Sequence, residues 1–148
     1  YVPFLSFFPA FYTLYQHRNV ELWEEYGRGQ VSKEELNRQR FLYPLEAVGA
    51  GDAAFGRGFS DDFFSVIPTK SRLMPHAYEV LEYLAGKYNL YILSNGFREL
   101  QSRKMRSAGV DGYFRKVILS EDLGVLKPWP EIFNFALSAT SIRVASNP

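Results

Sequence analysis

The sequence contains no cysteine among its 148 residues. It therefore offers no disulfide framework, no thiolate nucleophile and no cysteine-ligated metal, as is common in cytoplasmic proteins. It also lacks an apolar run that approaches the roughly 18 residues of a membrane-spanning helix. Its first residues lack the basic flank of a signal peptide. These absences predict a soluble, cytoplasmic protein.

An excess of charge of one sign is also missing. The sequence has 17 lysines and arginines and 16 aspartates and glutamates, which gives a net charge of +1. This balance gives no electrostatic reason to expect binding to nucleic acid or to an anionic membrane. The only histidines, His17 and His76, have no partner at metal-ligand spacing, so we interpret them as surface or cap residues. A hydrophobic content of 47% and an aromatic content of 17% indicate a globular chain.

The first part of the chain has the apolar pattern of helices. In the first segment, which Gly27 closes, apolar residues recur at helical spacing. Ser32 followed by Glu35 is a capping-box pattern, so a second helix should begin at Lys33 and continue until Pro44 interrupts it. The apolar positions of the first segment are Phe11, Leu14, Tyr15, Leu22, Trp23 and Tyr26.

A third helical segment follows, with Phe55, Phe59 and Phe63 on its apolar positions. Gly56 and Gly58 interrupt this pattern, and each costs about 1 kcal/mol relative to alanine inside a helix. The apolar spacing still predicts a helix, because helical periodicity is the primary signal.

From about residue 71 the pattern changes to alternating helices and strands. Pro75 suits the first turn of a helix, and Gly109 and Pro130 mark the end and the start of two others. Residues 90–93 and 117–119 are short apolar runs that predict buried strands. Strand-helix alternation implies parallel pairing, so the sequence predicts an α/β fold.

Polar residues follow the predicted strand at residues 90–93. Ser94, Asn95 and Gly96 come where this strand ends, and open α/β sheets bind ligands at the carboxyl ends of their strands. A serine hydroxyl can donate a hydrogen bond to an anion there, and the two backbone N–H groups can add to it. Lys127 lies in a loop bounded by glycine and proline after the next strand. Together these residues predict a phosphate-binding site.

A simpler interpretation makes Ser94 or Asn95 the cap of the following helix and makes Lys127 a solvated surface residue. For the serine the two interpretations coexist, because a helix N-terminus favours anions. We favour phosphate binding because a hydroxyl, N–H groups and an ammonium group meet at strand ends.

Two motifs carry a resemblance to a known family. They are Leu93-Ser94-Asn95-Gly96 and Gly124-Val125-Leu126-Lys127-Pro128, the latter followed by Pro130-Glu131-Ile132-Phe133. They resemble the second and third signature motifs of haloacid dehalogenase-like (HAD) phosphohydrolases, nearest to the pyrimidine 5′-nucleotidase-like branch. The resemblance covers roughly residues 5–140. It implies a Rossmannoid parallel sheet, incomplete here, with an inserted helical cap at residues 1–70 and a partial α/β core at 71–148.

The resemblance also implies Mg²⁺-dependent hydrolysis of a phosphate monoester, such as a nucleoside monophosphate, through an aspartyl-phosphate intermediate. Ser94 and the backbone of Asn95 and Gly96 would hold the phosphoryl oxygens, and Lys127 would stabilise charge, so Ser94 and Lys127 are the candidate catalytic residues. A second possibility is cleavage of a carbon–halogen bond, as in the founding dehalogenases. A third is an inactive fragment or phosphate-binding module.

Members of the family also carry an Asp-x-Asp-x-Thr motif before the cap and an acidic metal-binding motif on a later strand. Neither occurs in these 148 residues, so we assign no metal ligand and expect the chain alone to be inactive. Without those two strands, residues 90–93 have an unpaired edge that can recruit another strand. We therefore expect a strand-exchanged oligomer or a poorly folded α/β half, with the helical cap ordered.

Other residues have competing interpretations. Glu121 and Asp122 could bind metal, although we favour a role in ordering their loop. Asn37, Arg38 and Arg40 could contact a substrate from the cap. Several cap aromatics could stack on a nucleobase, although aromatics at helical spacing more often form core. They are Tyr12, Tyr15, Trp23, Tyr26, Phe41 and Tyr43.

Overall fold

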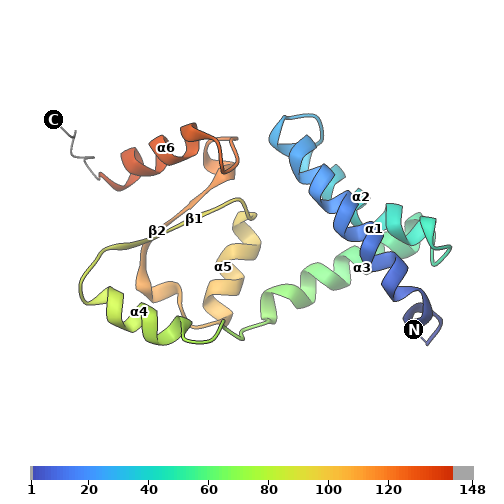
Figure 1. Ribbon diagram of the computed structural model, residues 1–148, viewed down its shortest axis with the longest axis horizontal. Helices are drawn as coiled ribbons and strands as arrows, with labels where there is room; N and C mark the ends of the chain where they lie inside the picture. The colour runs from blue at the N-terminus through green and yellow to red at the C-terminus, as the bar shows by residue number, and fades with distance from the viewer. Residues whose placement is uncertain (1, 142–148) are drawn as a thin grey trace. The chain divides into compact units, whose positions relative to one another are not determined.

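The computed structural model describes the backbone of residues 2–141 and the side chains of residues 6–141. The chain divides between Ser65 and Val66 into two compact units, a few residues before the boundary that the sequence suggested (Figure 1). Within residues 2–141, no helix combines the length and the apolar character that crossing a bilayer requires.

The first unit consists of three helices, α1 (Val2–Gly27), α2 (Lys33–Ala47) and α3 (Ala53–Val66). The predicted start of α2 is confirmed, because the Ser32 hydroxyl accepts a hydrogen bond from the Glu35 N–H at 3.1 Å. Asp52 caps α3 by accepting hydrogen bonds from the N–H groups of Ala54 and Phe55 at 2.9 Å. These two bonds lower the pKa of Asp52 below its ordinary range.

The expectation that Pro44 interrupts α2 was wrong, because the helix continues to Ala47. A proline inside a helix removes its own hydrogen bond to the residue four positions earlier, and its ring crowds that residue's carbonyl. Downstream bonds still form, since the Val48 N–H reaches the Pro44 carbonyl at 3.2 Å. Pro44 and Leu45 are also fully buried. Burial of these apolar side chains offsets the lost hydrogen bond.

Phe41 lies at the centre of the core of the first unit, with only 2% of its surface exposed. Its ring packs on Tyr15 at a centroid distance of 5.5 Å and on Phe63 at 4.9 Å. The expectation that aromatic residues at helical spacing form core therefore holds for Phe41. It does not extend to Tyr12 and Tyr43, which are exposed.

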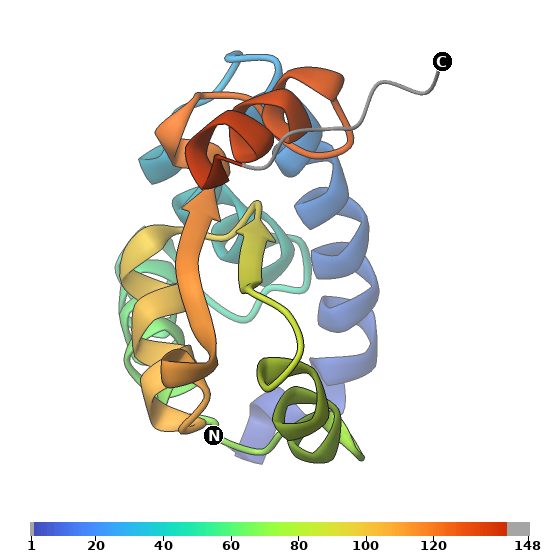
Figure 2. The same cartoon turned by 90° about the vertical axis from the view of Figure 1, so that its left-hand side faces the viewer.

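The second unit contains a two-stranded parallel sheet, which confirms the predicted α/β class. Strand β1 (Leu90–Ser94) pairs with β2 (Phe114–Leu119), and Ser94 lies opposite Leu119. Figure 2 shows both strands pointing toward the end of the unit where α6 lies. The other elements are η1 (Ile67–Thr69), α4 (Ala77–Ala85), α5 (Arg98–Ser107), η2 (Asp111–Tyr113), η3 (Ser120–Asp122) and α6 (Pro130–Thr140).

Helix ends in the second unit follow the predicted turn residues with one exception. Gly109 ends α5 with φ +66, and its N–H bonds to the Arg106 carbonyl at 3.0 Å, as in a Schellman motif. Pro130 opens α6 as predicted. Pro75, however, lies in the turn before α4 and not in its first turn. The reason is that His76 adopts a left-handed conformation, with φ +63, immediately before the helix.

The two glycines inside α3 make a matched test of this packing. A Cβ at Gly58 would have no atom within 4 Å, whereas a Cβ at Gly56 would lie 3.0 Å from Leu42 Cδ1 on α2. We expect Gly58→Ala to raise the free energy of unfolding by about 1 kcal/mol, because alanine is the better helix former. Gly56→Ala should gain less or lose stability, because the methyl group presses on Leu42. Urea unfolding of both variants tests this, and equal gains would contradict the close approach of α2 and α3.

Candidate functional site

The candidate site lies where the two parallel strands end. Ser94 is the last residue of β1 and pairs with Leu119, the last residue of β2. The next residue after β2, Ser120, has only 2% of its surface exposed, and its hydroxyl donates to the Asn95 carbonyl at 3.3 Å. The loops that leave the two strands are therefore bonded to each other directly beyond the sheet.

The side chain of Asn95 binds the backbone of Lys127. Its Nδ2 donates to the Lys127 carbonyl at 3.1 Å, and its Oδ1 accepts from the Lys127 N–H at 2.8 Å. An amide side chain offers one donor group and one acceptor group, so it can satisfy both polar groups of one residue. From the sequence, Asn95 was expected to contact phosphate through its backbone alone. The structure adds this side-chain function, which brings the two signature motifs together.

Lys127 points its ammonium group at the end of β1. Its Nζ donates to the Leu93 carbonyl at 2.9 Å. This bond uses one of three N–H donors and leaves two for another acceptor. Among the side chains of residues 6–141, no carboxylate forms an ion pair with Lys127. The ammonium group is therefore a positive charge held one residue from Ser94.

The Ser94 hydroxyl accepts two hydrogen bonds within its own segment. The Gly96 N–H donates to Ser94 Oγ at 3.0 Å, and Gln101 Nε2 donates to it at 2.8 Å. The Gly96 N–H was expected to bind phosphate, whereas in the structure it donates to the serine. Both lone pairs of Oγ are then used, which leaves the O–H free to donate. Gln101 was missed, because no local sequence pattern marks a glutamine in the second turn of the following helix.

Glu121 and Asp122 are engaged by backbone N–H groups. Glu121 Oε2 accepts from the Arg98 N–H at 2.7 Å and so caps α5, and Asp122 Oδ2 accepts from the Leu119 N–H at 2.9 Å. Asp122 also pairs with the Arg98 guanidinium. These contacts support the loop-ordering interpretation of both carboxylates.

Within the described part of the chain, no group of three or more histidine, cysteine, aspartate or glutamate side chains could hold a metal ion. The two histidines, His17 and His76, are exposed. We therefore assign no Mg²⁺ ligand among the described residues.

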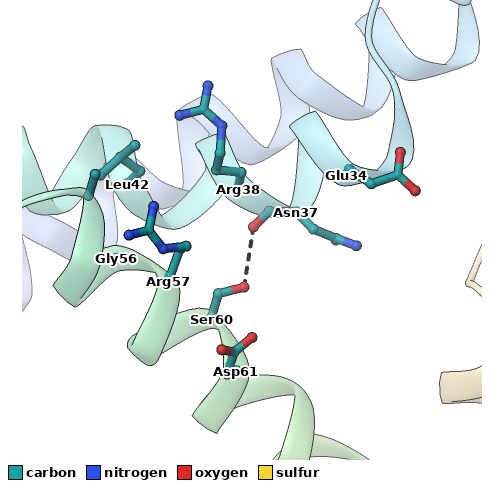
Figure 3. A pocket seen from close by; sticks show the side chains of 9 residues that line it. Glu34, Asn37, Arg38, Leu42, Gly56, Arg57, Ser60 and Asp61 are labelled. Atoms are coloured by element: carbon teal, nitrogen blue, oxygen red, sulfur yellow. Dashed lines mark hydrogen bonds between the residues drawn. The ribbon is translucent and has the colours of Figure 1, made fainter.

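The three polar candidates on α2 have different environments. Asn37 and Arg38 line a hollow of about 230 Å³ between α2 and α3, where the Ser60 hydroxyl donates to the Asn37 carbonyl at 3.5 Å (Figure 3). Arg38 also pairs with Glu35 at 2.7 Å. Arg40 does not line this hollow and is only 8% exposed.

The guanidinium of Arg40 lies over aromatic rings. It is 5.0 Å from the centroid of Phe41, 5.5 Å from that of Phe63 and 5.2 Å from that of Phe64. Burial lowers the pKa of Arg40. These contacts place the Arg40 guanidinium in the aromatic core.

Comparison with known proteins identifies the family. The family of haloacid dehalogenase-like hydrolases matches residues 5–145. The pyrimidine 5′-nucleotidase YjjG of Escherichia coli is 28% identical over 123 residues, which are 83% of this chain and 53% of that protein. The HAD-hydrolase YfnB of Bacillus subtilis is 27% identical over 121 residues, which are 82% of this chain and 51% of that protein. The chain thus spans about half the length of the curated relatives it matches.

Solved structures agree with the sequence matches. The magnesium-bound structure of YfnB has a TM-score of 0.75 at 25% identity, over 92% of this chain and 58% of that one. A 2-haloacid dehalogenase from Pseudomonas syringae has a TM-score of 0.56 at 25% identity, over 88% of this chain and 55% of that one. The family match covers nearly the whole sequence, and the signature motifs meet at the strand ends. The chain therefore belongs to the haloacid dehalogenase-like hydrolase family.

Proposed function

We propose that the whole protein hydrolyses a phosphate monoester and that this chain supplies the phosphate seat, defined as the Ser94 hydroxyl and the Lys127 ammonium group. The observation that carries the proposal is that Lys127 Nζ reaches the Leu93 carbonyl at 2.9 Å, beside the serine at the end of β1. A hydroxyl and an ammonium group can both donate to phosphoryl oxygens. The ammonium also compensates negative charge on a transferring phosphoryl group.

A nucleoside monophosphate is the substrate class that we propose. The support comes from the similarity to YjjG, which is a pyrimidine 5′-nucleotidase. Covalent hydrolysis through an aspartyl phosphate needs a positioned carboxylate. Glu121 and Asp122 bind backbone N–H groups, so neither is proposed as this nucleophile. No Mg²⁺ ligand is assigned among the described residues, and we derive no step through this ion.

Carbon–halogen cleavage is the second candidate, because the solved dehalogenase from Pseudomonas syringae shares the fold. Phosphate is favoured over a haloacid because the seat contains only donors and a full positive charge, which suits a dianion. A binding module without turnover is the candidate from another class. For the 148-residue chain alone we propose this last role, namely phosphate binding without hydrolysis.

The substrate class is tested on the whole protein by measuring phosphate released from a pyrimidine nucleoside monophosphate and halide released from a 2-haloacid. We expect phosphate release that Lys127→Ala lowers by about 10²–10³-fold, as for other groups that stabilise transition-state charge. Halide release without phosphate release would support the dehalogenase instead. Lys127-dependent hydrolysis by the 148-residue chain itself would contradict its role as a binding module.

The seat is tested separately by titrating the 148-residue chain with inorganic phosphate and following the heat of binding. Lys127→Ala should abolish most of the binding, because this ammonium is the only full positive charge assigned to the seat. Lys104→Ala is the matched control, since it removes the same charge from an exposed position on α5. An equal loss in both variants would indicate general electrostatics and not a seat.

Asn95 is expected to hold Lys127 in place. Asn95→Ala removes both hydrogen bonds to the Lys127 backbone, and leaving such groups unpaired costs about 1–3 kcal/mol when they are buried. Hydrogen exchange of the Lys127 amide should therefore accelerate. Asn95→Asp keeps the acceptor for this N–H but loses the donor to the carbonyl, so its exchange should be intermediate. Unchanged exchange of the Lys127 amide in Asn95→Ala would show that the loop is ordered without the two hydrogen bonds from Asn95.

The unpaired edge of β1 generates a prediction about assembly. In the described part of the chain β1 pairs only with β2, and an open apolar edge recruits further strands. We propose that the isolated chain forms a strand-exchanged oligomer through this edge. Sedimentation at several concentrations tests it. A monomer at every concentration, with slow amide exchange at Tyr91–Leu93, would contradict the proposal.

A further inference from the structure

The side chain of Gln101 reaches from α5 back to the end of β1. Gln101 is the fourth residue of α5, and its Nε2 donates to Ser94 Oγ at 2.8 Å. The backbone of Gln101 is fixed by the helix, since its N–H donates to the Phe97 carbonyl at 2.9 Å. The glutamine therefore extends toward the serine from a defined position.

Gly96 leaves the space that this glutamine occupies. A Cβ at Gly96 would lie 2.1 Å from Gln101 Nε2 and 2.9 Å from Cδ, too close for atoms that are not bonded, so the end of the glutamine side chain would have to move. Gly96 is not among the residues with positive φ, so its backbone conformation does not require glycine. Glycine is needed at position 96 because any side chain there would occupy the space of the Gln101 amide. Gly96 and Gln101 thus form one unit, in which the first admits the second.

Together the two residues fix what the serine hydroxyl can do. Oγ has two lone pairs and one hydrogen. The Gly96 N–H and the Gln101 amide each donate to Oγ, at 3.0 and 2.8 Å. Without the glutamine, one lone pair would be open, and the hydroxyl could rotate and accept a bond from water or from the Lys127 ammonium. When Gln101 donates to Oγ, both lone pairs are used, and the hydroxyl can only donate its hydrogen.

We propose that Gln101 is a positioning residue that, with Gly96, makes the Ser94 hydroxyl an obligate donor to a phosphoryl oxygen. The inference rests on the proposed phosphate seat and deepens it. Gln101 acts through Ser94 and does not itself touch the ligand. Its removal should therefore weaken phosphate binding only while the serine hydroxyl is present.

The test is a double-mutant cycle on the 148-residue chain, titrated with inorganic phosphate. Gln101→Leu removes the amide and keeps a good helix former, and we expect it to weaken binding about tenfold, the value of one well-made hydrogen bond. In the Ser94→Ala background the same change should have no effect. Ser94→Thr retains a hydroxyl and should restore the dependence on Gln101. Ser102→Leu, an exposed position on the same helix, is the control and should bind like the wild type.

Gly96→Ala gives a second route to the same defect, because its methyl group displaces the glutamine. It should weaken binding about as much as Gln101→Leu, and the two effects should not add. Circular dichroism and the unfolding midpoint establish that each variant is folded. If Gln101→Leu is unfolded, Gly96→Ala takes its place in the cycle. Its effect on phosphate binding should then be present with Ser94 and absent in the Ser94→Ala background.

The outcomes separate this inference from the proposed function. If Ser94→Ala weakens phosphate binding but Gln101→Leu does not, Gln101 has no positioning role, while the proposed phosphate seat is still supported. A loss in Gln101→Leu that persists in the Ser94→Ala background would also overturn it, since the glutamine would then act by another route. Absence of phosphate binding by the wild-type chain, or binding that Ser94→Ala leaves unchanged, would overturn both.

Discussion

The two hydrogen bonds between the Asn95 side chain and the Lys127 backbone are the contact on which the site depends. They join residues that are 32 positions apart in the sequence. Parallel pairing brings the ends of β1 and β2 to one edge of the sheet, but it does not determine where the loop after β2 turns. The amide does so, because it matches both the donor and the acceptor of one residue. The Lys127 ammonium then reaches the Leu93 carbonyl.

Around this contact, two acidic side chains form structural hydrogen bonds, while the Lys127 ammonium group points toward the end of β1. Glu121 and Asp122 accept backbone N–H bonds, which orders the start of α5 and the turn after β2. Lys127 keeps two N–H donors that no described residue uses. A chain with a net charge of only +1 can in this way present a local concentration of donors. The family relationship and the geometry are therefore consistent with binding of an anion.

The two units are stabilised in different ways. The first buries aromatic rings around Phe41, and it also holds the Arg40 guanidinium against three of those rings. Such contacts stabilise a partly desolvated cation. The second unit has a sheet of two strands, every residue of β1 is only half-buried, and α4 has no buried residue. A sheet of this size depends on the helices that pack on it.

Sequence by itself determined the family, the α/β class, the start of α2 at Lys33 after its cap Ser32, and the end of α5 just before Gly109. It also placed Ser94 at the end of a strand and Lys127 in the loop that follows the next strand. These features depend on local backbone preferences and on apolar periodicity, which residues close together in the sequence determine. Only the tertiary structure decided that α2 continues past Pro44, that the Asn95 side chain hydrogen-bonds the Lys127 backbone and that Gln101 donates to Ser94. Burial of a proline, and the reach of an amide to a residue distant in the sequence, depend on how the elements pack, and no local pattern encodes that packing.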